Sequence, residues 1–455
     1  MALHANIEWD IRPANGSDNN GGGFKAGATG VDRSQQNGAF ASLTTLSLVH
    51  TTTTQINVSL TDYTVSADDV GNVLQITGGS ATAGFYEITA VDVGNNRWTL
   101  DRSAGTAAQT VVGAMGGALA TVNKANGALV AGQKIHVKAE AWNEAVSITV
   151  AGTSAAPIVI EGYTSTHGDG GSATNNRASA AGDAITCSVT GLVFKNLIAT
   201  AAGGDGFDVS TASSIKYINC RATANGGAGF NASQNGGIRT YINCQSDGNT
   251  GGGFVAGGGN ASTMLAIGCE SRGNGGNGYQ ATSSGEIRIV HCLCYGNSAT
   301  GITPNQGTTA IINTTVHSNT GASSDGYSFG AAGFNITIWN CIFSSNGRYG
   351  INFGSSTGHS PNINYNNFHS NGTAARNNIA AGANDLALDP QYTDASNGNF
   401  TIGTNLKAAG FPGLFPRGVT TGYLDMGAVQ RQEPAGGGDP FPSRGLHHIE
   451  QGVCV

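Results

Sequence analysis

The sequence predicts an all-β chain, a right-handed parallel β-helix solenoid with a small N-terminal β head and a C-terminal cap and tail. Three repeated marks between residues 191 and 371 predict it. A short apolar strand that ends in Cys or a substitute recurs seven times, in steps of 22 to 27 residues. A Gly followed by Phe, Tyr or Ile recurs in a second phase, and an Asn about five residues after the Cys recurs in a third. Marks that share one period over many turns are the signature of a solenoid.

The type of solenoid follows from the composition of the repeated runs. They are five to seven residues long, β-branched and aromatic, and separated by Gly, Asn, Ser and Asp, which excludes helical repeats and leucine-rich repeats. Stacked coils place equivalent residues in columns. We expect two columns to face inward, the Cys column and the apolar residue two positions earlier. They comprise Cys220, Cys244, Cys269, Cys292 and Cys341, and Ile218, Ile242, Ile267, Val290 and Ile312.

The two other marks have physical roles in such a stack. The recurring Asn suits a turn in the left-handed conformation whose side-chain amide bonds the Asn of the next coil. The aromatic or Ile after Gly begins the next strand and stacks as an apolar ladder. These marks are Asn225, Asn249, Asn274, Asn297, Asn319, Asn346 and Asn371, and Phe207, Phe230, Phe254, Tyr279, Ile302, Tyr327 and Ile351.

On these repeats the chain resembles the pectate-lyase-like superfamily of right-handed parallel β-helices over residues 116–432. The resemblance implies the fold and leaves the activity open. Segments 384–392, 398–402 and 424–429 resemble the closing segment of many bacterial and viral β-helix proteins, and we interpret this part as a cap rather than a site.

Three parts follow along the chain. Residues 1–115 contain short strands separated by Gly, Asn and Asp turns and are predicted to form a β-rich head for attachment or oligomerisation. Residues 116–432 form the β-helix, and a short helix over 117–126 is expected to cap its open end. Residues 433–455 are a Gly/Pro linker followed by a tail peptide.

Composition limits the partners. The formal net charge is -7, only 11% of residues are charged, and no basic stripe is present, so we expect no nucleic-acid partner. No apolar run reaches membrane length, and the N-terminus lacks the features of a signal peptide, so we expect no membrane partner and no export signal. The packing role of the cysteines favours free buried thiols, which suggests folding in a reducing cytoplasm.

The sequence yields no assigned catalytic, cofactor or metal residue, and we expect no cofactor. The aspartate clusters and the Gly-His-Gly and Arg-Ile-Lys motifs of galacturonan hydrolases are absent. Two weaker patterns remain: Asp205 and Asp208 as a carboxylate pair, and Glu270 beside Arg272 or Arg288 on a neighbouring coil. The preferred interpretation is that these charged side chains lie on the surface and keep the faces of the solenoid soluble. His447, His448 and Cys454 form a further, weaker metal hypothesis.

These observations favour a structural protein of a tailed bacteriophage virion, as a tailspike, head spike or capsid-decorating protein. A head precedes the β-helix, a signal peptide is missing, and segments 16–24 and 84–88 resemble those of phage-encoded β-helix proteins. We expect display on the virion surface after assembly in the host cytoplasm, for adhesion to host glycans or particle stabilisation. The expected partners are the chain itself as a homotrimer, other virion proteins through the head and tail, and host-surface polysaccharide. The alternative is a polysaccharide-degrading enzyme, either a phage depolymerase or a bacterial lyase or hydrolase.

Overall fold

The computed structural model confirms the all-β fold. It describes residues 3–47, 54–106, 109–210, 214–232, 236–257, 262–282, 285–305, 307–330, 335–354, 360–411 and 424–430. The chain divides into two compact units, residues 1–237 and 238–455. Within the described residues, no helix is long and apolar enough to cross a bilayer. The predicted linker and tail over 433–455, with His447, His448 and Cys454, lie outside the described residues.

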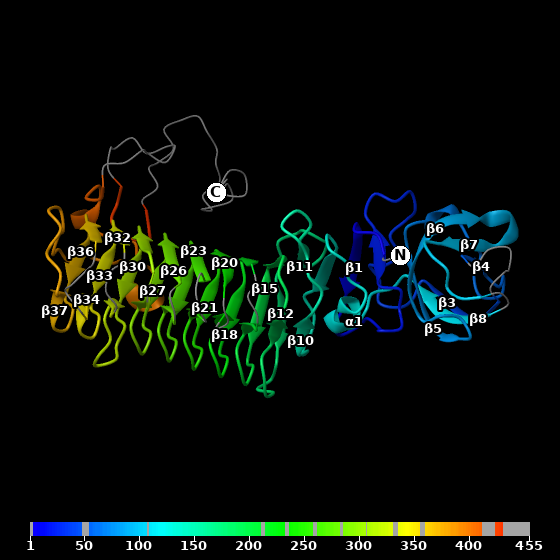
Figure 1. Cartoon of the computed structure of the whole chain (residues 1–455), viewed down its shortest axis with the longest axis horizontal. Coiled ribbons are helices and arrows are strands. Elements are labelled where there is room, and N and C mark those ends of the chain that lie inside the picture. Colours follow the sequence, from blue (N-terminus) through cyan, green and yellow to red (C-terminus); the bar gives the residue numbers. More distant parts are fainter. Residues whose placement is uncertain are drawn as a thin grey trace, which may run out of the picture. The chain divides into compact units, whose positions relative to one another are not determined.

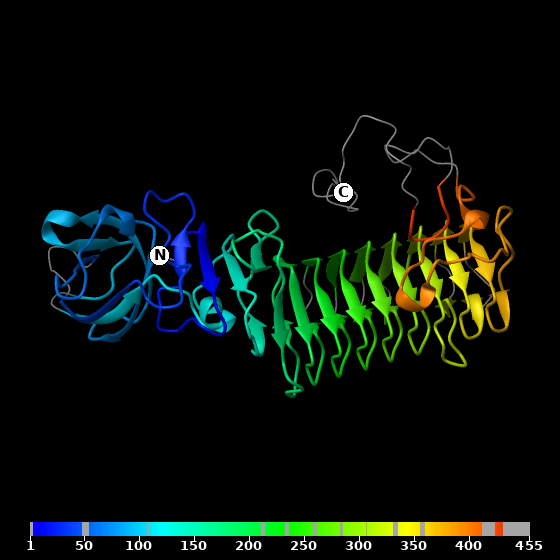
Figure 2. The same cartoon turned by 180° about the vertical axis from the view of Figure 1, so that it is seen from behind.

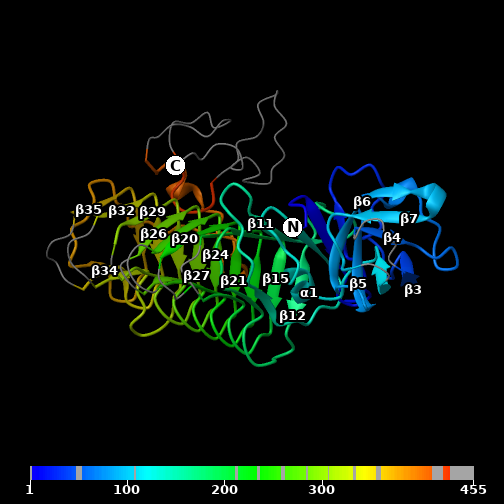
Figure 3. The ribbon, with the colours of Figure 1, turned by 45° about the vertical axis from the view of Figure 1, so that its right-hand side comes forward.

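The first unit contains an antiparallel six-stranded sheet (Figure 3). Its strands, in spatial order, are β3 (Ala41–Ser47), β8 (Thr110–Met115), β5 (Val73–Gly79), β6 (Gly84–Asp92), β7 (Arg97–Leu100) and β4 (Gln55–Asn57), with 3-10 turns at Ala67–Asp69 and Val93–Asn95. Apolar residues on one face, among them the fully buried Trp98, form its core. Asp69 is buried beneath them and accepts hydrogen bonds from Trp98 Nε1 and Tyr63 Oη. A β-rich head is therefore present.

The first unit also contains parallel coils. One sheet holds β2 (Gly23–Lys25), β1 (Ile7–Ile11), β9 (Lys134–Lys138), β11 (Ile158–Tyr163), β14 (Leu192–Lys195) and β17 (Ile215–Ile218). A second holds β10 (Val146–Ile148), β13 (Ile185–Cys187), β16 (Phe207–Val209) and β19 (Phe230–Ala232). A third holds β12 (Ala173–Asn176), β15 (Leu197–Thr200) and β18 (Arg221–Thr223). Strand β1 pairs in parallel with β9, so residues 7–11 of the predicted head extend the parallel sheet. The domain boundary at residue 115 stays a prediction.

The expected capping helix forms as α1 (Val122–Asn126). Thr121 is its N-cap and accepts a hydrogen bond from the backbone N–H of Lys124, which satisfies one of the free donors at the helix start. The helix packs against β10, the first strand of its sheet, and against β9. Its buried side chains, Val122 and Ala125, explain why so short a helix is stable in this place.

The second unit consists of stacked parallel coils (Figure 1). One sheet holds β20 (Gly237–Ile242), β23 (Ser262–Ile267), β26 (Glu286–Val290), β29 (Thr309–Ile312), β32 (Asn335–Trp339) and β35 (Ser360–Asn364). Another holds β22 (Phe254–Ala256), β25 (Tyr279–Ala281), β28 (Ile302–Thr303), β31 (Tyr327–Phe329), β34 (Tyr349–Phe353) and β37 (Ala374–Asn377). The third holds β21 (Gln245–Asp247), β24 (Glu270–Arg272), β27 (Leu293–Tyr295), β30 (Thr315–His317), β33 (Ile342–Ser344) and β36 (Asn367–His369).

The inward positions of the coils confirm one predicted column and correct another. The column cysteines are buried, and aromatic rings stack between coils, as Phe254 and Tyr279 do with centroids 4.9 Å apart. The seven described cysteines are buried and form no disulfide bond. In the apolar column two residues before the Cys, the inward placement was wrong for four of the five residues. Ile242, Ile267, Val290 and Ile312 are only partly buried, while Tyr241 and Ile289 fill the interior; Ile218 is buried.

The cause is a corner residue in the left-handed conformation directly before each column cysteine. Asn243 and Asn340 have φ of 52° and 55°, and Gly268 occupies the same position with φ of 62°. This corner turns the chain between the two strands, so the period-2 alternation of one strand does not continue into the next.

The asparagine ladder is confirmed, with one correction. Asn274 Nδ2 donates to Oδ1 of Asn297 at 2.9 Å, and Asn297 Nδ2 donates to Asn319 at 3.0 Å. The left-handed residue, however, is the one before each ladder Asn, as with Gly273 (φ 60°) and Ser318 (φ 49°). The Asn side chain points inward, where its amide donates to the ladder Asn of the next coil and to a backbone oxygen of the preceding coil, as Asn274 does to Asn297 and Ser246.

Residues 384–411 follow the last coil and include two 3-10 turns, Ala395–Asn397 and Thr404–Leu406. Ile402, Leu406 and Met426 are buried against Ile342 of β33. Figure 2 shows the orange part of the chain, which contains these turns, lying against the coils. The segment therefore packs on the side of the second unit, and its position shapes the surface of the third sheet.

Candidate functional site

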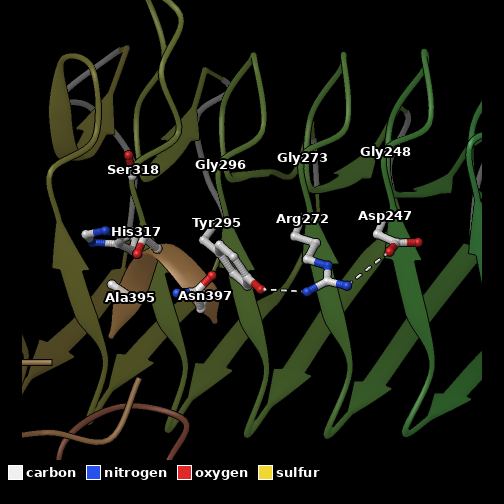
Figure 4. A pocket seen from close by; sticks show the side chains of 11 residues that line it. Asp247, Gly248, Arg272, Gly273, Tyr295, Gly296, His317, Ser318, Ala395 and Asn397 are labelled. Carbon is white, nitrogen blue, oxygen red and sulfur yellow. Dashed lines mark hydrogen bonds and ion pairs between the residues drawn. The ribbon is translucent and has the colours of Figure 1, made fainter. Parts of the chain in front are cut away.

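Four polar side chains form one outward column on the third sheet of the second unit. The last residues of β21, β24, β27 and β30 are in register, so that Asp247 pairs with Arg272, Arg272 with Tyr295, and Tyr295 with His317. The middle residue of each strand points inward instead, as the buried Ser271 and Cys294 do. Figure 4 shows the four side chains side by side on successive coils.

These residues line a groove with a volume of about 640 Å³. Its other wall is the 3-10 turn Ala395–Asn397 of the cap segment, which supplies Ser396 and Asn397. The turn approaches the sheet so closely that a Cβ on Gly398 would lie 2.7 Å from Tyr295 Oη, and φ at Gly398 is 79°. The interpretation of this segment as a cap without a site role therefore needs correction, because the segment forms part of the groove.

Phe400 of the same segment holds two of the side chains in place. Its ring packs edge-on against Tyr295, with centroids 4.7 Å apart, and against His317 at 5.5 Å. Tyr392 packs against Phe400 at 5.0 Å and against His317 at 5.4 Å. The aromatic cluster therefore fixes the rotamers of Tyr295 and His317 before any ligand is present.

A charged network runs along the groove floor. Arg272 contacts Asp247 at 3.1 Å through one terminal nitrogen, and through the other it contacts Glu270 at 3.4 Å and donates to Tyr295 Oη at 3.3 Å. The Tyr295 hydroxyl in turn donates to Glu270 Oε1 at 2.7 Å, and Gln245 donates to Glu270 Oε2 at 3.2 Å. The Arg272 side chain keeps 36% of its surface exposed, so the guanidinium is accessible from solvent.

The ionisation of these groups follows from their surroundings. Burial raises the pKa of Tyr295 to about 12, with Glu270 adding to the effect, so the phenol stays protonated at neutral pH. Burial lowers the pKa of His317 to about 4, which keeps the imidazole neutral. Burial lowers the pKa of Arg272, but Tyr295, Glu270 and Asp247 outweigh it, so the pKa lies above its ordinary value. The groove thus offers a fixed cation, phenol and amide donors and the Asp247 carboxylate, with Glu270 bound to Arg272 and Tyr295 beside it.

The two carboxylates suggested by the sequence, Asp205 and Asp208, lie in the first unit. Burial, with the charges of Asp183 and Asp205, raises the pKa of Asp208 to about 6. Burial also raises the pKa of Asp205, whose carboxylate accepts from the backbone N–H of Ala228 and from Asn231 at 2.6 Å. Asp183, which the sequence analysis did not single out, accepts a hydrogen bond from the backbone N–H of Asp205 at 2.7 Å.

Of the two arginines that the sequence suggested as partners of Glu270, Arg272 is the one in contact with it. Glu270 contacts Arg272, whereas Arg288 pairs with Glu286 of its own strand at 2.9 Å. Tyr295 and His317 were missed by the sequence analysis. Their position within the repeat could have identified them. Each lies three residues after a residue of the Cys column, as Asp247 and Arg272 do. The wall at Ala395–Asn397 has no such signal, because it comes from outside the repeat.

Comparison with known proteins finds one matching family model and several similar solved structures. Residues 287–413 match a family model described as a domain of unknown function (DUF5123). No curated protein is significantly similar to the chain. Among solved structures, the pectate lyase Pel9A is 17% identical, with 69% of this chain and 92% of that chain covered and a TM-score of 0.48. A rhamnogalacturonan lyase is 11% identical, with 61% and 86% covered and a TM-score of 0.35.

A tailspike protein, gp49 from Pseudomonas phage LKA1, is 13% identical, with 78% of this chain and 64% of that chain covered and a TM-score of 0.17. At these identities and TM-scores the similarities carry no argument about activity. The function therefore has to be argued from the groove of this chain.

Proposed function

We propose that the chain is a polysaccharide-binding β-helix protein whose glycan lies in the groove over β21, β24, β27 and β30. The observation that carries the proposal is the in-register column of Asp247, Arg272, Tyr295 and His317, faced by the cap turn. A glycan is a chain of repeating units with hydroxyl groups along its length. A column that offers one polar side chain per coil, about 4.8 Å apart, suits an extended ligand of this kind.

The chemistry of the column agrees with a sugar ligand. Tyr295 combines an apolar ring face with a hydroxyl, the amphipathic character that binding sites use for ligands with both polar and apolar surface. Asp247 and Glu270 accept hydrogen bonds from hydroxyls, while Arg272 and Asn397 donate them. Asp247 in the groove and Glu270 beside it carry two negative charges against the single guanidinium of Arg272, so a neutral or weakly charged glycan is favoured over a densely anionic one.

Cleavage of the bound glycan is the second candidate function. Asp247 and Glu270 contact different terminal nitrogens of the same guanidinium, so two carboxylates lie close to Arg272, Asp247 lining the groove and Glu270 beside it. Glycoside hydrolysis requires a pair of carboxyl groups, one residue as acid and one as base or nucleophile. Binding is the first choice because Arg272 forms ion pairs with both carboxylates.

We also propose that the chain is displayed on a bacteriophage virion as a homotrimer, with its head and tail contacting other virion proteins. A β-rich head at the N-terminal side of the parallel coils supports it. Glycan binding by the groove fits adhesion to a host surface, and the same groove fits a depolymerase.

The test uses the full chain and a panel of purified bacterial surface polysaccharides, with binding measured by affinity electrophoresis and calorimetry. Arg272→Ala is expected to weaken binding at least about tenfold, because it removes a charged donor from the groove. Arg288→Ala is the matched control, since Arg288 is an exposed arginine that pairs with Glu286. No binding by any glycan, or equal binding by Arg272→Ala and wild type, would overturn the proposal. New reducing ends or an unsaturated, ultraviolet-absorbing product, lost in Glu270→Gln, would establish cleavage.

A further inference from the structure

A second cluster of side chains, independent of the groove, lies in the first unit. Glu8 of β1, His136 of β9 and His167 of the loop after β11 each place a potential metal-ligand atom within 4.8 Å of the other two. The strands β1, β9 and β11 are neighbours in one parallel sheet. The three residues are far apart in the sequence, so only the stacking of these strands brings them together.

His136 is the observation that points to a ligand. Only 3% of the surface of His136 is exposed, yet neither ring nitrogen makes a hydrogen bond to the described residues. Buried polar atoms without partners are rare in folded proteins because they forfeit the hydrogen bonds that water would supply. Nε2 of His136 lies 3.3 Å from Oε2 of Glu8. A cation between these two atoms would bind the nitrogen lone pair that otherwise has no partner.

His167 is oriented as metal-binding histidines usually are. Its Nε2 lies 2.8 Å from Oδ2 of Asp10, a carboxylate that is fully buried. Asp10 is itself held by the Tyr163 hydroxyl at 2.8 Å and by Arg12 at 3.1 Å. When Nε2–H donates to Asp10, Nδ1 carries the lone pair that a metal ion would bind. A carboxylate outside the metal's own ligands commonly fixes the tautomer of a ligating imidazole in this way.

The rings of His136 and His167 are stacked, with centroids 3.8 Å apart and planes inclined by 6°. Because the nitrogen lone pairs lie in the ring planes, both rings can bind one ion only after His167 turns out of this stack. An ion-pair network explains only part of the cluster, since Lys134 contacts Oε1 of Glu8 at 2.8 Å and leaves Oε2 facing His136. Within the described residues that network offers Nε2 of His136 only the 3.3 Å contact with Glu8 Oε2, and Nδ1 makes no hydrogen bond.

We propose that Glu8, His136 and His167 bind a divalent transition-metal ion, Zn²⁺ in the first instance, which ties the loop after β11 to strands β1 and β9. Two imidazoles and one carboxylate are ligands that Zn²⁺ and its first-row neighbours prefer, whereas Ca²⁺ and Mg²⁺ prefer oxygen alone. Bonds of about 2.0–2.2 Å in a tetrahedron put ligand atoms roughly 3.3–3.6 Å apart. The 3.3 Å between His136 and Glu8 already meets this requirement.

The remaining ligand is the one best able to adjust. His167 lies on a loop and its side chain is 15% exposed, so the ring has room to turn out of the stack toward the ion. Glu8 is accessible to an ion from solvent, because its side chain is 25% exposed and it lines, with Lys134, a small cavity of about 170 Å³. Three protein ligands leave a fourth position for water, as in open zinc sites.

The experiment loads the full-length protein with Zn²⁺, dialyses it, and measures bound metal by elemental mass spectrometry. Wild type is expected to retain one Zn²⁺ per chain, and His167→Gln and Glu8→Gln are expected to bind at least about tenfold more weakly. Co²⁺ supplies a second readout, through visible absorption bands that both variants lose. Circular dichroism of the metal-free variants shows whether they keep the fold.

Two matched variants separate this site from other histidines. His369→Gln, which changes a histidine in the second unit, is expected to bind Zn²⁺ as wild type does. The full-length double variant His447→Gln/His448→Gln tests the C-terminal peptide in the same way. The proposal is wrong if wild type retains no Zn²⁺, if His167→Gln binds it unchanged, or if the loss follows His447 and His448 instead.

Discussion

The hydroxyl of Tyr295 donates a 2.7 Å hydrogen bond to Oε1 of Glu270, one coil away, and the Tyr295 ring packs against Phe400 of the cap segment. The tyrosine therefore connects the repeated coils to the non-repeated segment that closes the groove. Its hydroxyl and its ring have separate partners, so their contributions can be measured separately.

Tyr295→Phe removes the hydroxyl and keeps the ring. We expect glycan affinity to fall about 5- to 20-fold, because a hydrogen bond to a charged group is lost and Glu270 keeps only Gln245 and Arg272 as partners. The apparent melting temperature should change little, since the packing against Phe400 is retained. Calorimetry with the bound polysaccharide measures the first quantity and thermal unfolding the second. Tyr349→Phe, outside the groove, is the control, and an equal loss of affinity in both variants would contradict the role of Tyr295.

Asp208→Asn tests the acidic cluster through pH. Because burial and the charges of Asp183 and Asp205 raise the folded-state pKa of Asp208 to about 6, the folded chain holds the proton more tightly than the unfolded chain, whose Asp pKa is about 3.9. The carboxylate therefore destabilises the fold above about pH 6, and this cost disappears as pH falls toward 4.

We expect Asp208→Asn to be about 1 kcal/mol more stable than wild type at pH 7, after allowance for solvent screening, and equal to it at pH 4. Thermal unfolding at a series of pH values measures the difference. Asp389→Asn, an exposed carboxylate of the cap segment, serves as the comparison. A gain that is the same at pH 4 and pH 7 would rule out the electrostatic explanation.

Ile289→Ala tests which column faces the interior. Ile289 is fully buried and stacks between Ala266 and Ile311, so its truncation should cost about 2–5 kcal/mol of unfolding free energy. Val290→Ala, at the next position, should cost less than about 1.5 kcal/mol, because Val290 is partly exposed. Denaturant unfolding of both variants makes the comparison. The reverse order would restore the first assignment of the inward column.

Asn274→Ala tests the amide ladder. Asn274 is fully buried, donates to Asn297 and to the backbone oxygen of Ser246, and accepts from Asn249 Nδ2 at 2.9 Å. Its removal leaves buried donors and acceptors without partners on two coils, which should cost about 2–4 kcal/mol. Asn305→Ala removes an exposed amide and should cost less than about 0.5 kcal/mol. Hydrogen exchange at the corners of neighbouring coils would show whether the loss spreads along the ladder.

The sequence alone determined the repeat, and through it the parallel β-helix, the buried cysteine column and the asparagine ladder. A solenoid is predictable in this way because each coil contacts its neighbours in one register, so residues with the same phase share one environment. The error in the inward apolar column has a local cause. A single left-handed residue at Asn243 or Gly268 shifts the alternation, and its conformation is not visible in the pattern of apolar residues.

Tertiary structure alone decided both candidate sites. The groove needs Ala395–Asn397 and Phe400, which come from outside the repeat and reach the column of Tyr295 by packing on the side of the coils. The proposed metal site needs Glu8 beside His136, and this depends on β1 pairing in parallel with β9. Periodicity specifies contacts between equivalent positions of successive coils. Contacts made by segments without the period depend on where the chain folds back, which no spacing in the sequence encodes.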